Sequence, residues 1–147
     1  MKPMRLDAPR FRTALVEANS KAHKSGEALC VWWLDVDDCS QLNDAFGERA
    51  VDEALSRIDQ QLSACGTTFA RMEGAAWAAF ATMSKVDAQA QAEAWRAAQA
   101  GHDSVALSLS VGLACRKKGE PALNLLEAAE LACTRAKQGG RGLVVAR

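Results

Sequence analysis

The sequence predicts an α/β fold in which helices cover a mainly antiparallel sheet. Three observations indicate this class. A continuous apolar run over residues 28–34 is typical of a strand buried on both faces. Stripes of apolar residues at helical spacing alternate with further short strands along the chain. Two of these strands, over residues 69–72 and 77–81, are close enough to form a β-hairpin.

The first half of the chain supplies two helices, one strand and this hairpin. We expect a helix over residues 10–24, where apolar residues recur at helical spacing before Gly26. The apolar strand follows and ends at Asp35. A second helix is predicted over residues 48–64, and residues 73–76 form the turn of the hairpin.

The second half continues the alternation. An Ala- and Gln-rich helix is predicted over residues 85–100, and an alternating strand over 105–111. Pro121 suits the first turn of a helix that runs to about Gln138, and a short strand over 143–145 ends the fold. Residues 1–147 are therefore expected to form one domain, with about five strands in its sheet.

Composition excludes several classes of protein. The chain has 147 residues, 49% of them hydrophobic, with 18 basic and 18 acidic side chains. This balance argues against disorder and against nonspecific attraction to nucleic acid or membranes. No apolar run reaches the roughly 20 residues of a membrane span, and no signal peptide is recognised, so a cytoplasmic location is expected.

The cysteines and the tryptophans of the strand and hairpin are interpreted as core residues. We expect the cysteines to be mostly buried free thiols in a reducing compartment, and the bulky tryptophans of the strand and hairpin to pack inside. These residues are Cys30, Cys39, Cys65, Cys115 and Cys133, with Trp32, Trp33 and Trp77.

Three separated segments share their order and spacing with one known family. Residues 34–47 read LDVDDCSQLNDAFG and are followed by Asp52. Residues 71–77 read RMEGAAW, and residues 110–114 and 135–141 read SVGLA and RAKQGGR. Together they resemble the GGDEF (diguanylate cyclase) family, with its D-[IV]-D-x-F-K-x-[IV]-N-D, R-[YF]-G-G-[DE]-E-F, S-[IV]-G-[IV]-A and R-A-K-x-x-G-R patterns. The resemblance implies a palm-like, nucleotidyl-cyclase-type sandwich. In the family, two such domains face each other and condense two GTP molecules into cyclic di-GMP.

The resemblance fails at the residues that would perform the chemistry. The family holds Mg²⁺ with carboxylates from the end of the first strand and from the hairpin, because phosphoryl transfer needs charge neutralisation. Asp35 keeps the first of these carboxylates and gives a partial metal site. The signature itself is replaced by Glu73, Gly74, Ala75, Ala76 and Trp77. Alanine offers no oxygen to a metal, so no cofactor is required and any Mg²⁺ binding is expected to be weak.

The positions that read the base are retained. The resemblance implies that Asn43 and Asp52 hydrogen-bond a guanine edge, that Leu55 forms an apolar wall, and that Lys137 and Arg141 contact the triphosphate. Structural roles are equally compatible with these residues. Asn43 can end a short helix, Asp52 can favour a helix N-terminus, and the two cations can stabilise a helix C-terminus.

Three functions follow in order of preference. The first is a catalytically inactive regulatory domain in cyclic di-GMP signalling. It would act through a signalling protein or a neighbouring domain, with GTP or cyclic di-GMP as residual ligands and a homodimer as one assembly. The second is a weak cyclase with altered metal ligands, and the third is an interaction scaffold without a ligand.

Overall fold

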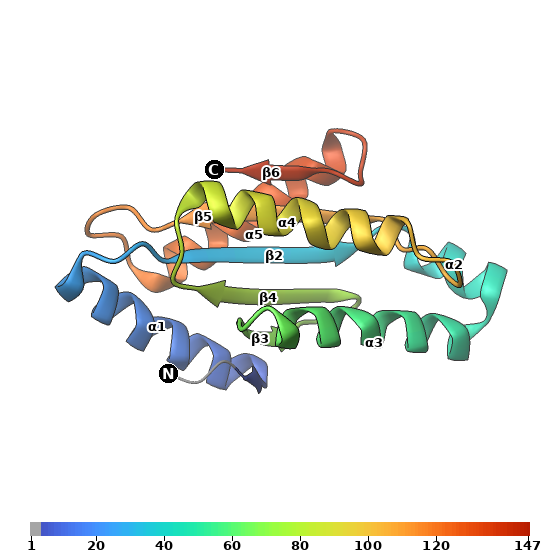
Figure 1. Ribbon diagram of the computed structural model, residues 1–147, viewed down its shortest axis with the longest axis horizontal. Coiled ribbons are helices and arrows are strands. Elements are labelled where there is room, and N and C mark those ends of the chain that lie inside the picture. Colours follow the sequence, from blue (N-terminus) through green and yellow to red (C-terminus); the bar gives the residue numbers. More distant parts are fainter. Residues whose placement is uncertain (1–3) are drawn as a thin grey trace.

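The computed structural model describes residues 4–147, which form a twisted sheet between two layers of helices (Figure 1). The sheet has six strands in the order β1-β3-β4-β2-β5-β6. Central β2 is antiparallel to β4 and β5, and β3 is antiparallel to β4, whereas β1 and β6 pair in parallel with β3 and β5. The predicted α/β class is thus confirmed. The strands are β1 (Arg5–Leu6), β2 (Cys30–Val36), β3 (Thr68–Arg71), β4 (Ala76–Ala81), β5 (Leu109–Cys115) and β6 (Val144–Ala146).

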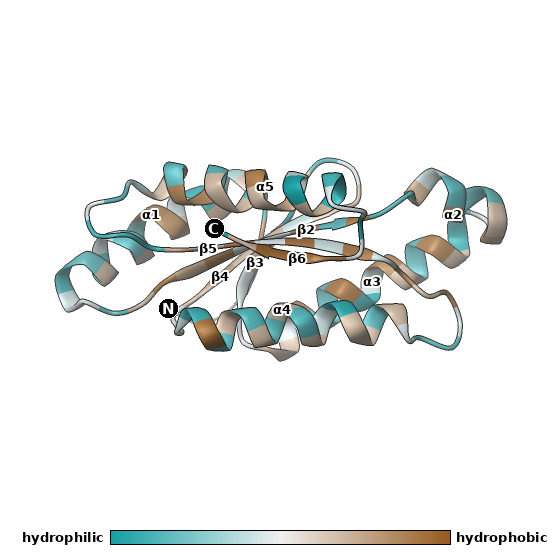
Figure 2. Ribbon diagram, turned by 90° about the horizontal axis from the view of Figure 1, so that it is seen from above, coloured by the Kyte–Doolittle hydropathy of each residue, from teal (hydrophilic) through white to brown (hydrophobic). Residues whose placement is uncertain are grey.

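Helices cover both faces of the sheet. In Figure 2, α1 (Ala8–Ser25) and α5 (Ala122–Gln138) lie on one face, and α3 (Glu48–Ala64) and α4 (Lys85–Ala100) lie on the other. The short α2 (Cys39–Phe46) extends beyond the end of β2. None of the helices within residues 4–147 combines the length and apolarity needed to cross a membrane.

Two apolar cores, one on each face, explain the continuous apolar run of β2. Trp32 and Leu34 pack with α3 and α4, whereas Val31 packs with α1 and α5. Successive strand residues point to opposite faces, so a strand covered on both sides needs apolar residues at nearly every position. Asp35 breaks this run on the α1–α5 face, at the edge of the covered region.

Several expected elements differ from the observed ones. The strand predicted over 105–111 begins instead at Leu109, because Leu109 pairs with Val36, the last residue of β2, and earlier residues have no strand to pair with. The strand continues through Gly112 to Cys115. Glycine has a weak strand propensity, so the sequence pattern did not predict this second half. Strand β1 and helix α2 were not in the predicted element order. Both are short, and α2 contains no fully buried residue that would give it a periodic signal.

The cysteine prediction is wrong for one pair. Cys30 and Cys115 are register partners on β2 and β5, with Cα atoms 4.1 Å apart, and they form a disulfide. Neighbouring positions on antiparallel strands bring two side chains together, which the 85-residue separation in sequence conceals. Cys39, Cys65 and Cys133 are free.

Gly112 sets the distance between β5 and α5. A Cβ atom at this position would lie 2.0 Å from the Ala129 carbonyl oxygen and 2.3 Å from the Cys133 amide nitrogen. Both are backbone atoms of a helix, which cannot move aside as a flexible side chain can. Any side chain here would therefore push α5 off the sheet.

We expect Gly112→Ala to lower the free energy of unfolding by about 3 kcal/mol or more, because overpacking against rigid backbone is costly. Urea denaturation followed by circular dichroism measures this. Gly101→Ala is the matched control, since its Cβ would meet only the Ala97 carbonyl oxygen at 3.3 Å. Equal stability of the two variants would show that α5 can retreat from β5.

Candidate functional site

Asp35 and the hairpin turn lie side by side, as the sequence predicted. Asp35 is the register partner of Ala76, and the Val36 amide donates to the Ala75 carbonyl oxygen at 2.9 Å. Ala76 therefore occupies a position from which a carboxylate could face Asp35, whereas Ala75 packs against the core on the other face of the sheet. Their methyl groups leave Asp35 as the carboxylate at this point of β2.

Lys137 occupies the space beside Asp35. Its Nζ lies 3.3 Å from Asp35 Oδ1 and 3.0 Å from Asp37 Oδ1, so one ammonium forms ion pairs with both carboxylates. Asp37 is almost completely buried, with its side chain 2% exposed. It also accepts hydrogen bonds from Ser108 Oγ at 2.6 Å, Ser110 Oγ at 2.7 Å and the Gly142 amide at 3.0 Å.

The two carboxylates differ in their electrostatics. Burial raises the pKa of Asp35 above its ordinary value of 3.8, although Lys137 opposes the shift. Burial also acts to raise the pKa of Asp37, but hydrogen bonds from Ser108, Ser110 and Lys137 outweigh it and lower this pKa. Burial similarly works against the charge of Lys137, yet its hydrogen bond to Asp37 and its attraction to Asp35 raise its pKa.

The same cluster disfavours ionisation of the nearest thiol. Burial and the neighbouring Asp35 charge raise the pKa of Cys133 to about 12. Cys133 is thus a protonated core residue and not a nucleophile.

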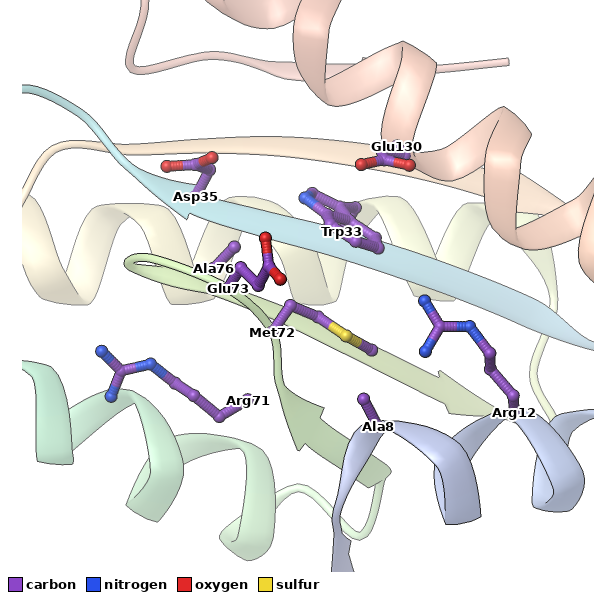
Figure 3. Close-up of a pocket in the computed structure, with 9 residues that line it drawn as sticks. All are labelled: Ala8, Arg12, Trp33, Asp35, Arg71, Met72, Glu73, Ala76 and Glu130. Atoms are coloured by element: carbon purple, nitrogen blue, oxygen red, sulfur yellow. The ribbon is translucent and has the colours of Figure 1, made fainter.

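A groove of about 740 Å³ opens beside Asp35 between α1 and α5 (Figure 3). Its floor is Trp33 of β2, and Glu73 of the hairpin and Glu130 of α5 lie on either side of it. Arg12 rises from α1 toward the groove. The complete lining is Ala8, Arg12, Trp33, Asp35, Arg71, Met72, Glu73, Ala76 and Glu130.

Arg71 and Gly74 fix the shape of the hairpin turn. Gly74 has φ +67°, a left-handed conformation that glycine adopts without strain. The Arg71 guanidinium donates to the Gly74 carbonyl oxygen at 3.3 Å and stacks 4.6 Å above the Trp77 ring. Arg71 thus extends away from Trp33, and Glu73 is left exposed at the rim.

The positions expected to read a base lie on α2 and α3. Asn43 is half-buried, and its Oδ1 is a buried acceptor without a hydrogen-bond donor among residues 4–147. Asp52 is exposed and lines a shallow depression on the outer side of α3, whose lining includes neither Asn43 nor Leu55. Leu55 is 5% exposed and belongs to the core with Val51 and Ile58.

The two expected phosphate contacts both have internal partners. Lys137 is held by Asp35 and Asp37, and Arg141 Nε lies 3.7 Å from Asp38 Oδ1. Asp38 and Arg141 have φ values of +53° and +67°, and no other non-glycine residue in the described chain has a positive φ. Strained backbone of this kind gathers at sites where geometry is imposed by the surroundings.

Several residues of this site were not identified from the sequence. Asp37 lies in the segment over residues 34–47, but no local pattern predicts its role, because the two serines that donate to it follow by more than 70 residues. Trp33 was interpreted as core, whereas the structure leaves it half-exposed in the groove. Arg12 and Glu130 carry no local sequence signal. Trp32 and Trp77 are fully buried, as expected.

Comparison with known proteins identifies the family to which this fold belongs. The family model described as "Diguanylate cyclase, GGDEF domain" matches residues 9–143. The chain therefore belongs to the GGDEF domain family. A comparison with curated protein sequences gave no match.

Solved structures support the same assignment. The chain is similar to the GGDEF domain of DgcB from Caulobacter crescentus in complex with c-di-GMP, with a TM-score of 0.89 and 23% identity over 98% of this chain and 89% of that one. It is also similar to the GGDEF domain of YfiN (TpbB) from Pseudomonas aeruginosa, with a TM-score of 0.83 and 27% identity over 96% and 95%. A third match is the diguanylate cyclase SiaD from Pseudomonas aeruginosa in complex with its activator SiaC, with a TM-score of 0.84, 22% identity, and coverage of 96% of this chain and 58% of SiaD.

The opposite pKa shifts predict opposite effects of neutralising the two carboxylates. At pH 7, Asp37→Asn should lower the free energy of unfolding by about 3 kcal/mol, because it leaves buried donors and part of the Lys137 charge unpaired. Asp35→Asn should raise it, because the raised pKa means that ionised Asp35 costs stability. Urea denaturation of both variants at pH 7 measures the difference.

The pH dependence of the free energy of unfolding follows from the directions of these two pKa shifts. The Asp37 contribution is complete above pH 3.8 and is lost as pH falls through the lowered folded pKa. The Asp35 cost grows as pH rises from 3.8 through the raised folded pKa and is complete above it. Loss of stability in both variants at pH 7 would contradict this electrostatic account.

Proposed function

We propose that this chain is a non-catalytic GGDEF domain that acts in cyclic di-GMP signalling through a protein partner. One observation carries the proposal: Asp35, whose charge is balanced by Lys137, faces Ala76 across the hairpin. A metal-dependent phosphoryl transfer needs several oxygen ligands around its ions. Within the described chain, no group of three histidine, cysteine or acidic side chains is placed to hold a metal.

The donor set does not fit the Mg²⁺ ions that the family's reaction needs. Asp35 offers one carboxylate, and an ammonium already lies 3.3 Å from it. A divalent ion there would have to displace Lys137 or tolerate its charge. Ala75 and Ala76 add no oxygen from their side chains. We therefore derive no catalytic step through a metal for this chain.

Glu73 also opposes binding of the substrate's phosphates. It is exposed at the turn beside Asp35, where its carboxylate would repel a triphosphate. Lys137 and Arg141, the cations expected to compensate, are paired with aspartates. The local charges thus favour the non-catalytic function over a residual cyclase.

A role through partners is compatible with the family. SiaD is seen in complex with an activator protein, and DgcB is seen with c-di-GMP. We propose that a signalling protein, a neighbouring domain or a second copy of this chain is the partner, and that it acts in the cytoplasm, where cyclic di-GMP is made.

The purified chain should not convert GTP to cyclic di-GMP. Incubation with GTP and Mg²⁺ or Mn²⁺, followed by chromatography of the products, tests this. Product formation that rises with protein concentration and disappears in Asp35→Ala would establish a residual cyclase instead.

Residual guanine-nucleotide binding is a second candidate function, and Asn43 favours it. A buried Oδ1 without a donor costs free energy, and a guanine N–H would satisfy it. Asp52 is exposed, and we propose that it accepts from the same base edge. Each such hydrogen bond contributes about 0.5–1.5 kcal/mol net, so binding is expected to be weak.

We expect Asp52→Ala to weaken calorimetrically measured GTP binding about two- to tenfold, which corresponds to one lost hydrogen bond. The unfolding transition should not change, because Asp52 is an exposed residue near the start of α3. Glu53→Ala is the matched control, since Glu53 is the neighbouring exposed carboxylate on the same helix. Binding should be nearly indifferent to Mg²⁺. Equal affinity for ATP and GTP, or unchanged affinity in Asp52→Ala, would show that these residues do not read guanine, and the absence of any binding would favour a scaffold without a ligand.

A further inference from the structure

Trp33 differs from the other tryptophans in having an unused indole N–H. It is half-exposed on the floor of the groove, and its Nε1 has no acceptor among residues 4–147. This donor is available to an acceptor of a bound ligand, such as a peptide carbonyl oxygen. In the other three tryptophans the indole nitrogen donates to Ala88 O (Trp32), Asp59 Oδ1 (Trp77) and Cys65 Sγ (Trp95).

Two unpaired carboxylates lie beside this indole. Figure 3 shows Trp33 between Glu73, which comes from the hairpin, and Glu130, which comes from α5. Neither carboxylate has an ion pair or hydrogen bond within the described chain, and both residues are exposed. The other acid in the groove, Asp35, is neutralised by Lys137.

The basic residues of the groove do not cancel these charges. Arg71 is directed to the Gly74 carbonyl oxygen and the Trp77 ring, away from Trp33. Arg12 stands on the α1 side and forms no ion pair with another described residue. The unpaired charges are therefore two carboxylates flanking an aromatic ring and one guanidinium on the opposite wall.

This arrangement selects a cation with an apolar stem. A guanidinium can stack on an indole face and donate to carboxylates on either side, which gives charge and geometry together. A phosphate at the same place would face Glu73 and Glu130 without a free cation between them. The volume of about 740 Å³ lies in the range of ligand sites, so a side chain and part of its backbone fit.

We propose that the groove binds an arginine side chain presented by a segment of a partner protein. The guanidinium lies over the Trp33 ring between Glu73 and Glu130. A backbone carbonyl oxygen of the same segment accepts from the indole N–H, and Arg12 receives an acidic group of that segment. The inference rests on the proposed function and names the chemistry of its partner. In this chain, Glu73 at the signature turn is a recognition residue for a cation.

The test uses an acetylated and amidated Gly-Arg-Gly peptide as the probe and the full chain as the target. The indole N–H signal of Trp33, assigned with Trp33→Phe, is followed in ¹⁵N–¹H correlation spectra during titration. We expect a saturable shift with Gly-Arg-Gly and none with Gly-Gln-Gly. Glu73→Gln and Glu130→Gln should each weaken the affinity about threefold, as expected for partly exposed charge pairs. Glu127→Gln, an exposed carboxylate on α5 outside the groove lining, should leave the affinity unchanged.

Three results would overturn the inference: no shift with Gly-Arg-Gly, an equal shift with Gly-Gln-Gly, or an affinity that neither Gln variant changes. A saturable shift with GMP and none with the arginine peptide would assign the groove to a nucleotide instead. These outcomes are distinct from failure of the proposed function, because turnover of GTP is measured separately and does not depend on what the groove binds.

Discussion

The buried carboxylate of Asp37 is the interaction on which the candidate site depends. It lies at the end of β2 and accepts hydrogen bonds from the segment before β5, from β5 itself, from α5 and from the loop before β6. A charge buried this deeply is tolerated only when several donors replace water. By satisfying that requirement, Ser108, Ser110, Lys137 and Gly142 fix where α5 ends relative to Asp35.

This requirement has a consequence for the chemistry of the site. Lys137 forms ion pairs with both the buried Asp37 and Asp35, so its ammonium lies beside Asp35. With Ala76 as the register partner of Asp35, the position where the family resemblance implies a divalent cation holds the ammonium of Lys137. The remaining unpaired charges lie farther along the groove, at Glu73, Glu130 and Arg12.

Much of the fold could be predicted from local patterns. The apolar run of β2, the helical stripes and the hairpin each carry a signal within a few residues, and the hairpin placed Asp35 beside Ala76 correctly. The start of β5 was misplaced because it is set by the length of β2, which is a partner far away in sequence. The Cys30–Cys115 disulfide and the serine hydrogen bonds to Asp37 could not be predicted either, because their partners are also far apart in sequence. The roles of Asn43, Asp52 and Leu55 came from the family resemblance and stay predictions.

We propose that the groove beside Asp35 does not bind a divalent metal ion. Binding of Mn²⁺ to the full chain, measured from the electron paramagnetic resonance signal of free Mn²⁺ at low millimolar concentrations, tests it most directly. We predict that the chain leaves this signal unchanged, and that Asp35→Asn behaves identically. Stoichiometric removal of Mn²⁺ from solution that is lost in Asp35→Asn would contradict the account.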